Sequence, residues 1–545
     1  MTDLREFLEM LKSMKELIEI DDRILPEPDV GAISNATCRL HGPALLLKNV
    51  IGFSNPILVG LHASDRKLAI ALGLPKDASV RDIFVEFSNR WERYPLPTIT
   101  VDNAPCKEVI IGEKDIDLTT LPICRWNAED GGPYIDKGVV ITRNPETDVI
   151  NAGIYRMQLK SPKELGVWPG LAHGIGIHYR KKEWGNEPLE VAIAIGNDPF
   201  LNLSAVSPLN ESWDELSFAG ALRGSPLEVV AAERVDLPVP ARSEYILEGI
   251  IETGEENRDF EGPFAEYTGY YTRIFRNPKI RIVSISHRKD PIYEGLYIGR
   301  PMTEMDYIAQ IPSSVAVYKQ VKTVIPEIEF FNLASTWALT GIASMKQSYG
   351  GQAKQLMNAI WGTPFGTYIK NLFIVDEDVD PFDINQVLWA FSVRFRGDDD
   401  IVTIRKAPGS MLDPSAPIRG ISTKVGFDLT EPKSPDTVIE TIGVVDDRPE
   451  TAKWSKILES ILQDKKSFLL DKVEHREWQV ERCPRCENGD ILVMSQNENW
   501  KLVKCKRCSY IWRSTESPGM LARRSKLKKD DFEKIPYMPP LPSGS

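Results

Sequence analysis

Apolar side chains recur at helical spacing at the start of the chain. They stand at Leu4, Phe7, Leu8, Leu11, Met14 and Leu17. This spacing predicts one amphipathic helix over residues 1–20. Residues 44–61 then contain two short apolar runs that are typical of buried strands, and residues 65–72 resemble a helix with a polar cap. The beginning of the chain is therefore predicted to be an α/β unit.

The pattern changes to many short apolar runs between about residues 109 and 285. Gly, Pro and Asn separate these runs, among them GVVITR, VINAGIYRMQL, VAIAIG, EYILEGII and KIRIVSIS. Such a series predicts a β-rich barrel or sandwich. After Pro301 helical spacing returns, and a strand at 372–380 followed by a helix around 384–395 indicates a second α/β unit.

Charge and composition narrow the class of protein. The 545 residues carry a formal net charge of −12, which disfavours binding of the whole molecule to nucleic acid or to an anionic membrane. No run approaches the roughly 18 apolar residues of a membrane span, and the charged N-terminal pattern differs from a signal peptide, so we expect a cytoplasmic protein. The seven cysteines are expected to form no disulfides.

Four of the cysteines form two pairs near the C-terminus. Cys483 and Cys486 are separated by 18 residues from Cys505 and Cys508, which is the spacing of a zinc ribbon. A hairpin around Asn497 would bring the two pairs together around a tetrahedral zinc ion, which would be structural because protein fills all four positions. Unrelated cysteines or a redox pair are the alternatives. Residues 501–529 hold ten Lys or Arg and one Glu, yet few aromatics, so a solvated basic face or a contact to an acidic subunit is favoured over nucleic-acid binding.

Three segments of the β-rich region carry polar groups that a core does not tolerate without a partner. Asn151 and Arg156 interrupt one strand pattern, Glu261 and Glu266 flank a Gly-Pro turn, and His173 and Glu215 form a third group. An arginine near two carboxylates can leave one of them a proton donor near neutral pH. An amide oxygen, an imidazole and a carboxylate suit a divalent ion such as Mn or Mg. Each residue taken singly also fits a structural role.

Longer strings carry a more specific signal. NAGIYR, LAH, ELSFAGALRG, the segment from PARSEYILEG to EGPFAEYTGYY, LWAFSVRFR and STKVGFD occur in this order. They resemble the UbiD family of reversible decarboxylases, which use prenylated FMN, and the resemblance covers most of residues 1 to about 430. It implies a multidomain α/β (α+β) fold with a central split β-barrel that binds the flavin.

The resemblance also implies site residues. A divalent ion, commonly Mn but also Mg or Fe, would join the flavin phosphate to Asn151, His173 and Glu215, with a potassium ion beside it. Flavin contacts would come from Ile154, Tyr155, Arg156, Ala172, Val206, Ser207 and Pro208. The catalytic network would be Arg156, Glu261 and Glu266, with Glu266 as the proton donor. Small side chains at Ala407, Pro408 and Gly409 suggest room for a bulky ring.

The predicted domains follow from the patterns and the resemblance together. We expect an N-terminal α/β domain at 1–108, the flavin-binding barrel at 109–300, an α/β oligomerisation domain at 301–431, a connector and helix at 432–478, the zinc ribbon at 479–515 and a basic, Pro-rich tail at 516–545. The connector's helix is expected around 452–464.

The expected function is reversible, non-oxidative decarboxylation of an aromatic or α,β-unsaturated acid, with the flavin as electron sink. The partners would be this carboxylate and CO2, further copies of the chain in a dimer or a hexamer built from dimers, and a flavin prenyltransferase that supplies the cofactor. One alternative is a prenylated-FMN subunit of a larger carboxylase complex that docks through the zinc ribbon. A zinc-ribbon nucleic-acid adaptor with an inactive enzyme fold is the other, and the presence of Arg156, Glu261 and Glu266 argues against it.

Overall fold

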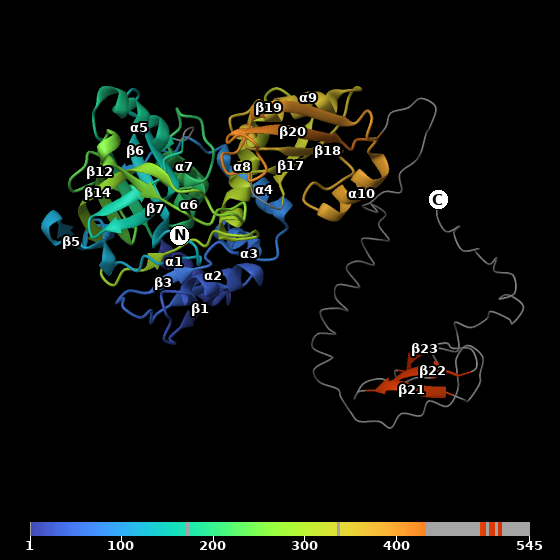
Figure 1. Cartoon of the computed structure of the whole chain (residues 1–545), viewed down its shortest axis with the longest axis horizontal. Helices are drawn as coiled ribbons and strands as arrows, with labels where there is room; N and C mark the ends of the chain where they lie inside the picture. Colours follow the sequence, from blue (N-terminus) through green and yellow to red (C-terminus); the bar gives the residue numbers. More distant parts are fainter. Residues whose placement is uncertain are drawn as a thin grey trace, which may run out of the picture. The chain divides into compact units, whose positions relative to one another are not determined.

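The computed structural model describes residues 2–170, 174–334 and 338–431, together with 491–496, 501–506 and 511–514. The chain divides into two compact units, residues 1–445 and 446–545, which are described separately (Figure 1). In the described residues no helix has the length and apolar character that crossing a membrane requires.

The N-terminal region places helices against a small sheet. Its elements are α1 Leu4–Ser13, β1 Leu17–Ile20, α2 Asp29–Arg39, β2 Ala44–Leu47, β3 Ile57–Val59, α3 Asp65–Ala71 and α4 Val80–Trp91, with sheet order β1-β2-β3-β15, where β15 is Tyr293–Glu294. The prediction of one helix over 1–20 is wrong. The helix ends at Ser13, Lys15 takes a positive φ of 60°, and Leu17 starts a strand that pairs in parallel with β2. Leu17 is apolar because it is buried in strand β1. Its match to the helical spacing is a coincidence.

The central region is a closed antiparallel barrel. Its elements are β4 Ile99–Thr100, β5 Val109–Gly112, β6 Tyr134–Arg143, β7 Ile150–Ser161, β8 Glu164–Val167, α5 Gly174–Gly185, β9 Leu189–Ile195, α6 Pro199–Ala205, α7 Glu215–Arg223, β10 Glu228–Ala231, β11 Pro238–Pro240, β12 Tyr245–Ile251, β13 Arg258–Glu261 and β14 Phe275–His287. The order β12-β9-β6-β7-β8-β14 closes through a further pairing of β12 with β14, which makes a six-stranded ring. The barrel prediction is confirmed.

A mixed five-stranded sheet follows the barrel. Its elements are α8 Glu304–Lys322, β16 Ile328–Leu333, β17 Thr340–Met345, α9 Gln352–Trp361, β18 Asn371–Asp376, α10 Ile384–Arg394, β19 Ile401–Pro408 and β20 Ile421–Asp428, with sheet order β16-β17-β18-β20-β19. Strands β17, β18 and β20 run parallel to one another, while the two edge strands are antiparallel to their neighbours. This is the α/β unit that the return of helical spacing predicted.

The second unit contains a three-stranded antiparallel sheet. Strands β21 Ile491–Gln496, β22 Lys501–Cys505 and β23 Ile511–Ser514 pair in that order, so the expected hairpin is present. Cys505 ends β22 with its side chain buried. Cys483, Cys486 and Cys508 lie outside the described residues, as does the helix expected at 452–464.

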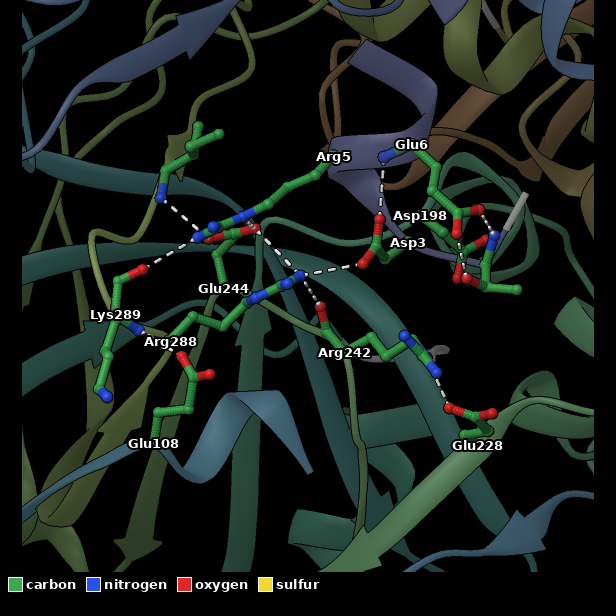
Figure 2. Close-up of polar contacts among 12 residues, drawn as sticks. Asp3, Arg5, Glu6, Glu108, Asp198, Glu228, Arg242, Glu244, Arg288 and Lys289 are labelled. Atoms are coloured by element: carbon green, nitrogen blue, oxygen red, sulfur yellow. Dashed lines mark hydrogen bonds and ion pairs between the residues drawn. The ribbon is translucent and has the colours of Figure 1, made fainter. Parts of the chain in front are cut away.

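An ion-pair cluster fastens α1 to the barrel region (Figure 2). Arg5 donates from Nε and Nη2 to the two carboxylate oxygens of Glu244, each at 2.8 Å. Glu244 is fully buried just before β12, and Arg288 at the end of β14 also donates to Asp3, at 3.1 Å. Ion pairs with Glu244 and Arg288 thus hold the first helix to the barrel region.

Candidate active site

Strand β7 and the turn after β13 bring a guanidinium between two carboxylates. Arg156 donates from Nε and Nη2 to Glu261, each at 3.0 Å, and from Nη1 to Glu266. The exposed fractions are 6% for Arg156, 0% for Glu261 and 7% for Glu266. The three residues predicted as a network therefore lie in one buried cluster, although Arg156 and Glu266 are 110 residues apart in the sequence.

Neighbouring side chains fix the orientation of this cluster. Tyr134 donates its hydroxyl to Glu261 Oε1 at 3.0 Å, and Asn277 donates its amide to Glu261 Oε2 at 2.9 Å. The aromatic rings of Trp168 and Phe264 lie 4.7 and 5.3 Å from the guanidinium carbon of Arg156. Glu261 thus accepts four hydrogen bonds, which fix its orientation beside Arg156.

Burial sets the protonation of the other groups. Burial raises the pKa of Glu266, and the charge of Arg156 beside it offsets only part of that effect. Burial by itself would lower the pKa of Arg156, but the charges of Glu261 and Glu266 outweigh it, so that pKa is raised. The cluster therefore pairs a permanent cation with one carboxyl group that retains its proton more readily than a free glutamate does.

A second polar pair lies at the start of β7. Asn151 donates its amide to Glu215 Oε1 at 3.0 Å, and the backbone N–H of Ala152 donates to Glu215 Oε2 at 2.9 Å. Glu215 is the first residue of α7, and burial raises its pKa to about 8. Asn151 Oδ1 is buried and accepts no hydrogen bond from the part of the chain that the structure describes. A carboxylate and a spare amide oxygen fit a hard divalent cation.

Tyrosines connect the two polar groups. Burial raises the pKa of Tyr155, and the nearby Glu215 and Tyr368 add to that effect. Burial likewise raises the pKa of Tyr267, with Glu266 and Tyr368 adding to it. The hydroxyl of Tyr267 also lies 2.9 Å from Ser410 Oγ, which follows β19 of the five-stranded sheet. The site lies where the barrel meets the five-stranded α/β region.

The structure describes some of the other predicted flavin contacts and leaves others outside the described residues. Ala172 and His173 lie outside the described residues, so the ligand set of Asn151, His173 and Glu215 is untested as a whole. The turn of Val206, Ser207 and Pro208 follows α6, whose Ser204 donates to the backbone oxygen of Glu215 at 2.6 Å. Ile154 and Tyr155 are half-buried on β7. Among the described residues no group of three or more His, Cys, Asp or Glu is placed to hold a metal.

Sequence patterns did not reveal several residues of the site. Tyr134 and Asn277 are single polar residues in strands, and nothing in the sequence signals their contact with Glu261. Lys424 donates to the backbone oxygens of Gly366, Thr367 and Ile369 at 2.8 to 3.0 Å, and burial lowers its pKa to about 8. The turn at 364–366 has no lysine of its own, but Lys424 reaches it from β20.

Known protein families and relatives match most of the chain. Models of the 3-octaprenyl-4-hydroxybenzoate carboxy-lyase (UbiD) N-terminal, Rift-related and C-terminal domains match residues 8–86, 98–301 and 306–429. The phenolic acid decarboxylase of Sedimentibacter hydroxybenzoicus is 38% identical over 474 residues, which is 85% of this chain and 98% of the relative. The chain belongs to the UbiD family. The phenolic acid decarboxylase of Bacillus subtilis, 39% identical over 84% of this chain and 99% of its own length, is a further UbiD relative.

Solved UbiD structures share the fold. The closed form of vanillic acid decarboxylase (ShVdcCD) from Sedimentibacter hydroxybenzoicus superposes with a TM-score of 0.78 at 38% identity, covering 85% of this chain and 99% of that one. The UbiD-class enzyme HmfF from Pelotomaculum thermopropionicum, in complex with FMN, gives 0.71 at 30% identity, covering 81% and 98%. Residues 478–526, beyond the UbiD models, match the EcdD/BsdD phenolic detoxification model.

Proposed function

We propose that this UbiD-family carboxy-lyase removes CO2 from a phenolic acid, reversibly and without net oxidation. The observation that carries the proposal is the buried Arg156 between Glu261 and Glu266. Relatives that match nearly their full length are named phenolic acid decarboxylases, and a structural neighbour is a vanillic acid decarboxylase. A benzoic acid that carries a ring hydroxyl is therefore the proposed substrate class.

Each residue of the cluster has a separate role in this proposal. Arg156 orients the substrate carboxylate next to the two glutamates, and Glu261 fixes Arg156 through its two hydrogen bonds. Glu266 donates its proton to the ring carbon that has lost CO2, since burial favours its protonated form. The atoms balance because the carbon exchanges CO2 for one proton, which Glu266 regains from water.

Prenylated FMN is the proposed cofactor, since neighbouring UbiD-class structures are named as complexes with FMN and prFMN. When bound it supplies an electron sink for the carbon–carbon bond cleavage. Asn151 and Glu215, with His173, would hold a divalent cation, Mn or else Mg or Fe, against the flavin phosphate, because Asn151 Oδ1 has no hydrogen-bond partner among the described residues. Potassium beside this ion, and backbone contacts near Ile154 and the turn of Val206, Ser207 and Pro208, complete the proposed site.

The C-terminal unit is the proposed zinc ribbon. Its hairpin ends at the buried Cys505, and with Cys483, Cys486 and Cys508 it would form a structural zinc ribbon. One Sedimentibacter vanillic acid decarboxylase structure is named as containing a truncated ShVdcD, and residues 478–526 match a family model separate from the UbiD domains. We propose that the enzyme is a homo-oligomer, a dimer or a hexamer built from dimers. Zinc content of the full chain, before and after Cys508→Ser, tests the ribbon.

The decisive experiment co-expresses the full chain with a flavin prenyltransferase and assays CO2 release from a panel of aromatic acids. A hydroxybenzoic acid should be converted to its phenol, and the purified protein should show a flavin-like absorbance band and contain Mn. Cofactor binding without turnover would point instead to a subunit that needs a partner, while a protein that binds no flavin contradicts the proposal.

A further inference from the structure

The connection between β19 and β20, residues 409–420, reaches the catalytic cluster from the five-stranded α/β region. Ser410 Oγ lies 2.9 Å from the hydroxyl of Tyr267, the residue after Glu266. The guanidinium carbon of Arg419 lies 4.0 Å from the centroid of the Phe275 ring, and Phe275 is the partner of Glu261 across β13 and β14. One segment thus touches the neighbours of both catalytic glutamates.

The catalytic cluster offers an anionic substrate no net positive charge. Arg156 uses three of its five N–H groups on Glu261 and Glu266, so a single positive charge faces two carboxyl groups. With Glu266 protonated the three residues sum to zero, and with it ionised they sum to −1. An incoming carboxylate gains nothing net from this cluster unless a further positive charge is close.

Arg419 and Arg273 provide that charge. Arg419 packs on the ring of Phe275, and Arg273 lies two residues before Phe275 in the sequence. Partial burial, followed by the positive charges of Arg156 and Arg273, lowers the pKa of Arg419. Arg419 donates from Nε to the backbone oxygen of Met411 at 3.3 Å. In the described part of the chain neither Arg419 nor Arg273 forms an ion pair with a carboxylate, and both side chains are exposed. An arginine whose guanidinium is not engaged in an ion pair can bind a carboxylate through two parallel hydrogen bonds.

Exposed apolar side chains lie close to these two arginines in the sequence. Tyr270 is 62% exposed and Ile274 is 57% exposed on the segment between Glu266 and β14, and Ile418 is 59% exposed beside Arg419. Large exposed apolar groups on two segments that meet at a buried polar cluster are typical of a ligand entrance. An aromatic acid would satisfy both features, with its ring on the apolar side chains and its carboxylate on the arginine.

We propose that Arg419 binds the carboxylate of the aromatic acid as it enters, before Arg156 orients that carboxylate beside the two glutamates, with Arg273 adding positive charge to the same entrance. Arg419 is then a substrate-binding residue that the α/β region contributes to a site otherwise built by the barrel. The inference rests on the proposed function, since it takes the substrate to be an aromatic carboxylate. It explains why the connection at 409–420 reaches across to Tyr267 and Phe275.

The test is Arg419→Gln in the cofactor-loaded full chain. We expect KM for the acid to rise at least tenfold while kcat changes less than threefold, and Arg419→Lys to restore part of the loss. Inhibition by the phenol product, which has no carboxylate, should stay unchanged. The matched control is Arg276→Gln, because Arg276 lies next to Phe275 but pairs with Glu255. It should leave both constants unchanged.

Other outcomes separate this inference from its premise. Equal weakening of acid and phenol binding by Arg419→Gln would mean a structural role, and an unchanged KM would mean no role, so either result overturns the proposal. Calorimetric titration of the wild-type and variant proteins with the acid measures binding without turnover. If wild-type protein binds the acid through Arg419 but releases no CO2, the proposed function fails while the inference holds. If it binds none of the acids, both fail.

Discussion

Arg156 and Glu261 form a buried ion pair with two parallel hydrogen bonds, each of 3.0 Å. The fork of a guanidinium matches a carboxylate in this geometry, which fixes the plane of Arg156. Tyr134 and Asn277 hold the outer lone pairs of Glu261, so the pair cannot rotate as a unit. Glu266 meets the remaining side of the guanidinium through a single nitrogen. The arrangement leaves Glu266 as the carboxyl group with fewest fixed contacts, which suits a group that gives up and regains a proton.

Replacing Glu266 by glutamine should remove turnover and keep the cofactor. The amide preserves the shape and can still accept from Arg156, but it has no acidic proton to deliver. Loss of a positioned proton donor costs about 10²- to 10⁴-fold in rate. CO2 release measured beside the flavin absorbance of the same sample tests this. Glu256→Gln, in an exposed turn of the same region, is the control. Retained turnover in Glu266→Gln would transfer the proton-donor role to another group.

The pH dependence of kcat should report the protonated form of Glu266. Burial raises its pKa, so the active, protonated fraction is complete below that pKa and falls as pH rises through it. We expect kcat to decline on the alkaline side of the profile. The midpoint of this decline should lie above pH 4.3, which is about the pKa of an ordinary glutamate. Rates across a pH series with saturating acid measure this. A rate that increases with pH throughout the neutral range contradicts a protonated donor.

Tyr134→Phe should lower kcat without loss of the fold. The change removes one of four hydrogen bonds to Glu261, and a hydrogen bond of this kind contributes about 1 kcal/mol, or roughly fivefold in rate if it acts through the orientation of Arg156. KM for the acid should change little. Tyr179→Phe, which removes a hydroxyl bonded to Glu183, is the matched control. Equal kinetics for the two variants would exclude a positioning role for Tyr134.

The sequence predicts this site better than its surroundings. The short apolar runs indicate the strands β6, β7, β9, β12 and β14, since strands such as β6, β9 and β12 are buried on both faces. The family resemblance alone predicts the contact between Arg156 and Glu266. Sequence spacing does not predict it, because 110 residues separate the two residues. Tyr134 and Asn277 escape prediction because a lone polar residue in a strand has no signal for its partner. The end of α1 escapes because Leu17 fits both helical and strand patterns.

Glu215 should make the metal-free protein less stable as pH rises. Its pKa is about 8 in the folded chain against about 4.3 when unfolded. Below pH 4.3 both states hold the proton and the group has no effect. Between these values the unfolded chain loses its proton first, so stability falls with rising pH until about 8, above which the cost is complete. Mn bound to the carboxylate would remove this cost.

Glu215→Gln tests this linkage at pH 8. The metal-free variant should melt several degrees above the metal-free wild type, because a neutral amide carries no such penalty. Added Mn should raise the melting temperature of the wild type only, and the variant should retain less flavin. Glu211→Gln, an exposed neighbour before the same helix, should behave as the wild type. If the metal-free variant melts below the metal-free wild type, the result would contradict a raised pKa of Glu215 in the folded protein.

Arg5→Ala should destabilise the first unit far more than a nearby surface change. Glu244 is fully buried and accepts two hydrogen bonds from Arg5 (Figure 2), so removing the arginine leaves a buried carboxylate short of its main partner. Because the Arg5 side chain is 37% exposed, the cost should lie below the about 3–5 kcal/mol of a fully buried pair. Arg242→Ala is the control, since Arg242 pairs with the partly exposed Glu228, and pairs of that kind contribute about 0.2–1 kcal/mol. Thermal melting of the two variants should therefore differ by several degrees, with Arg5→Ala the lower. Equal melting temperatures would mean that Arg288, 3.5 Å from Glu244, neutralises that carboxylate unaided.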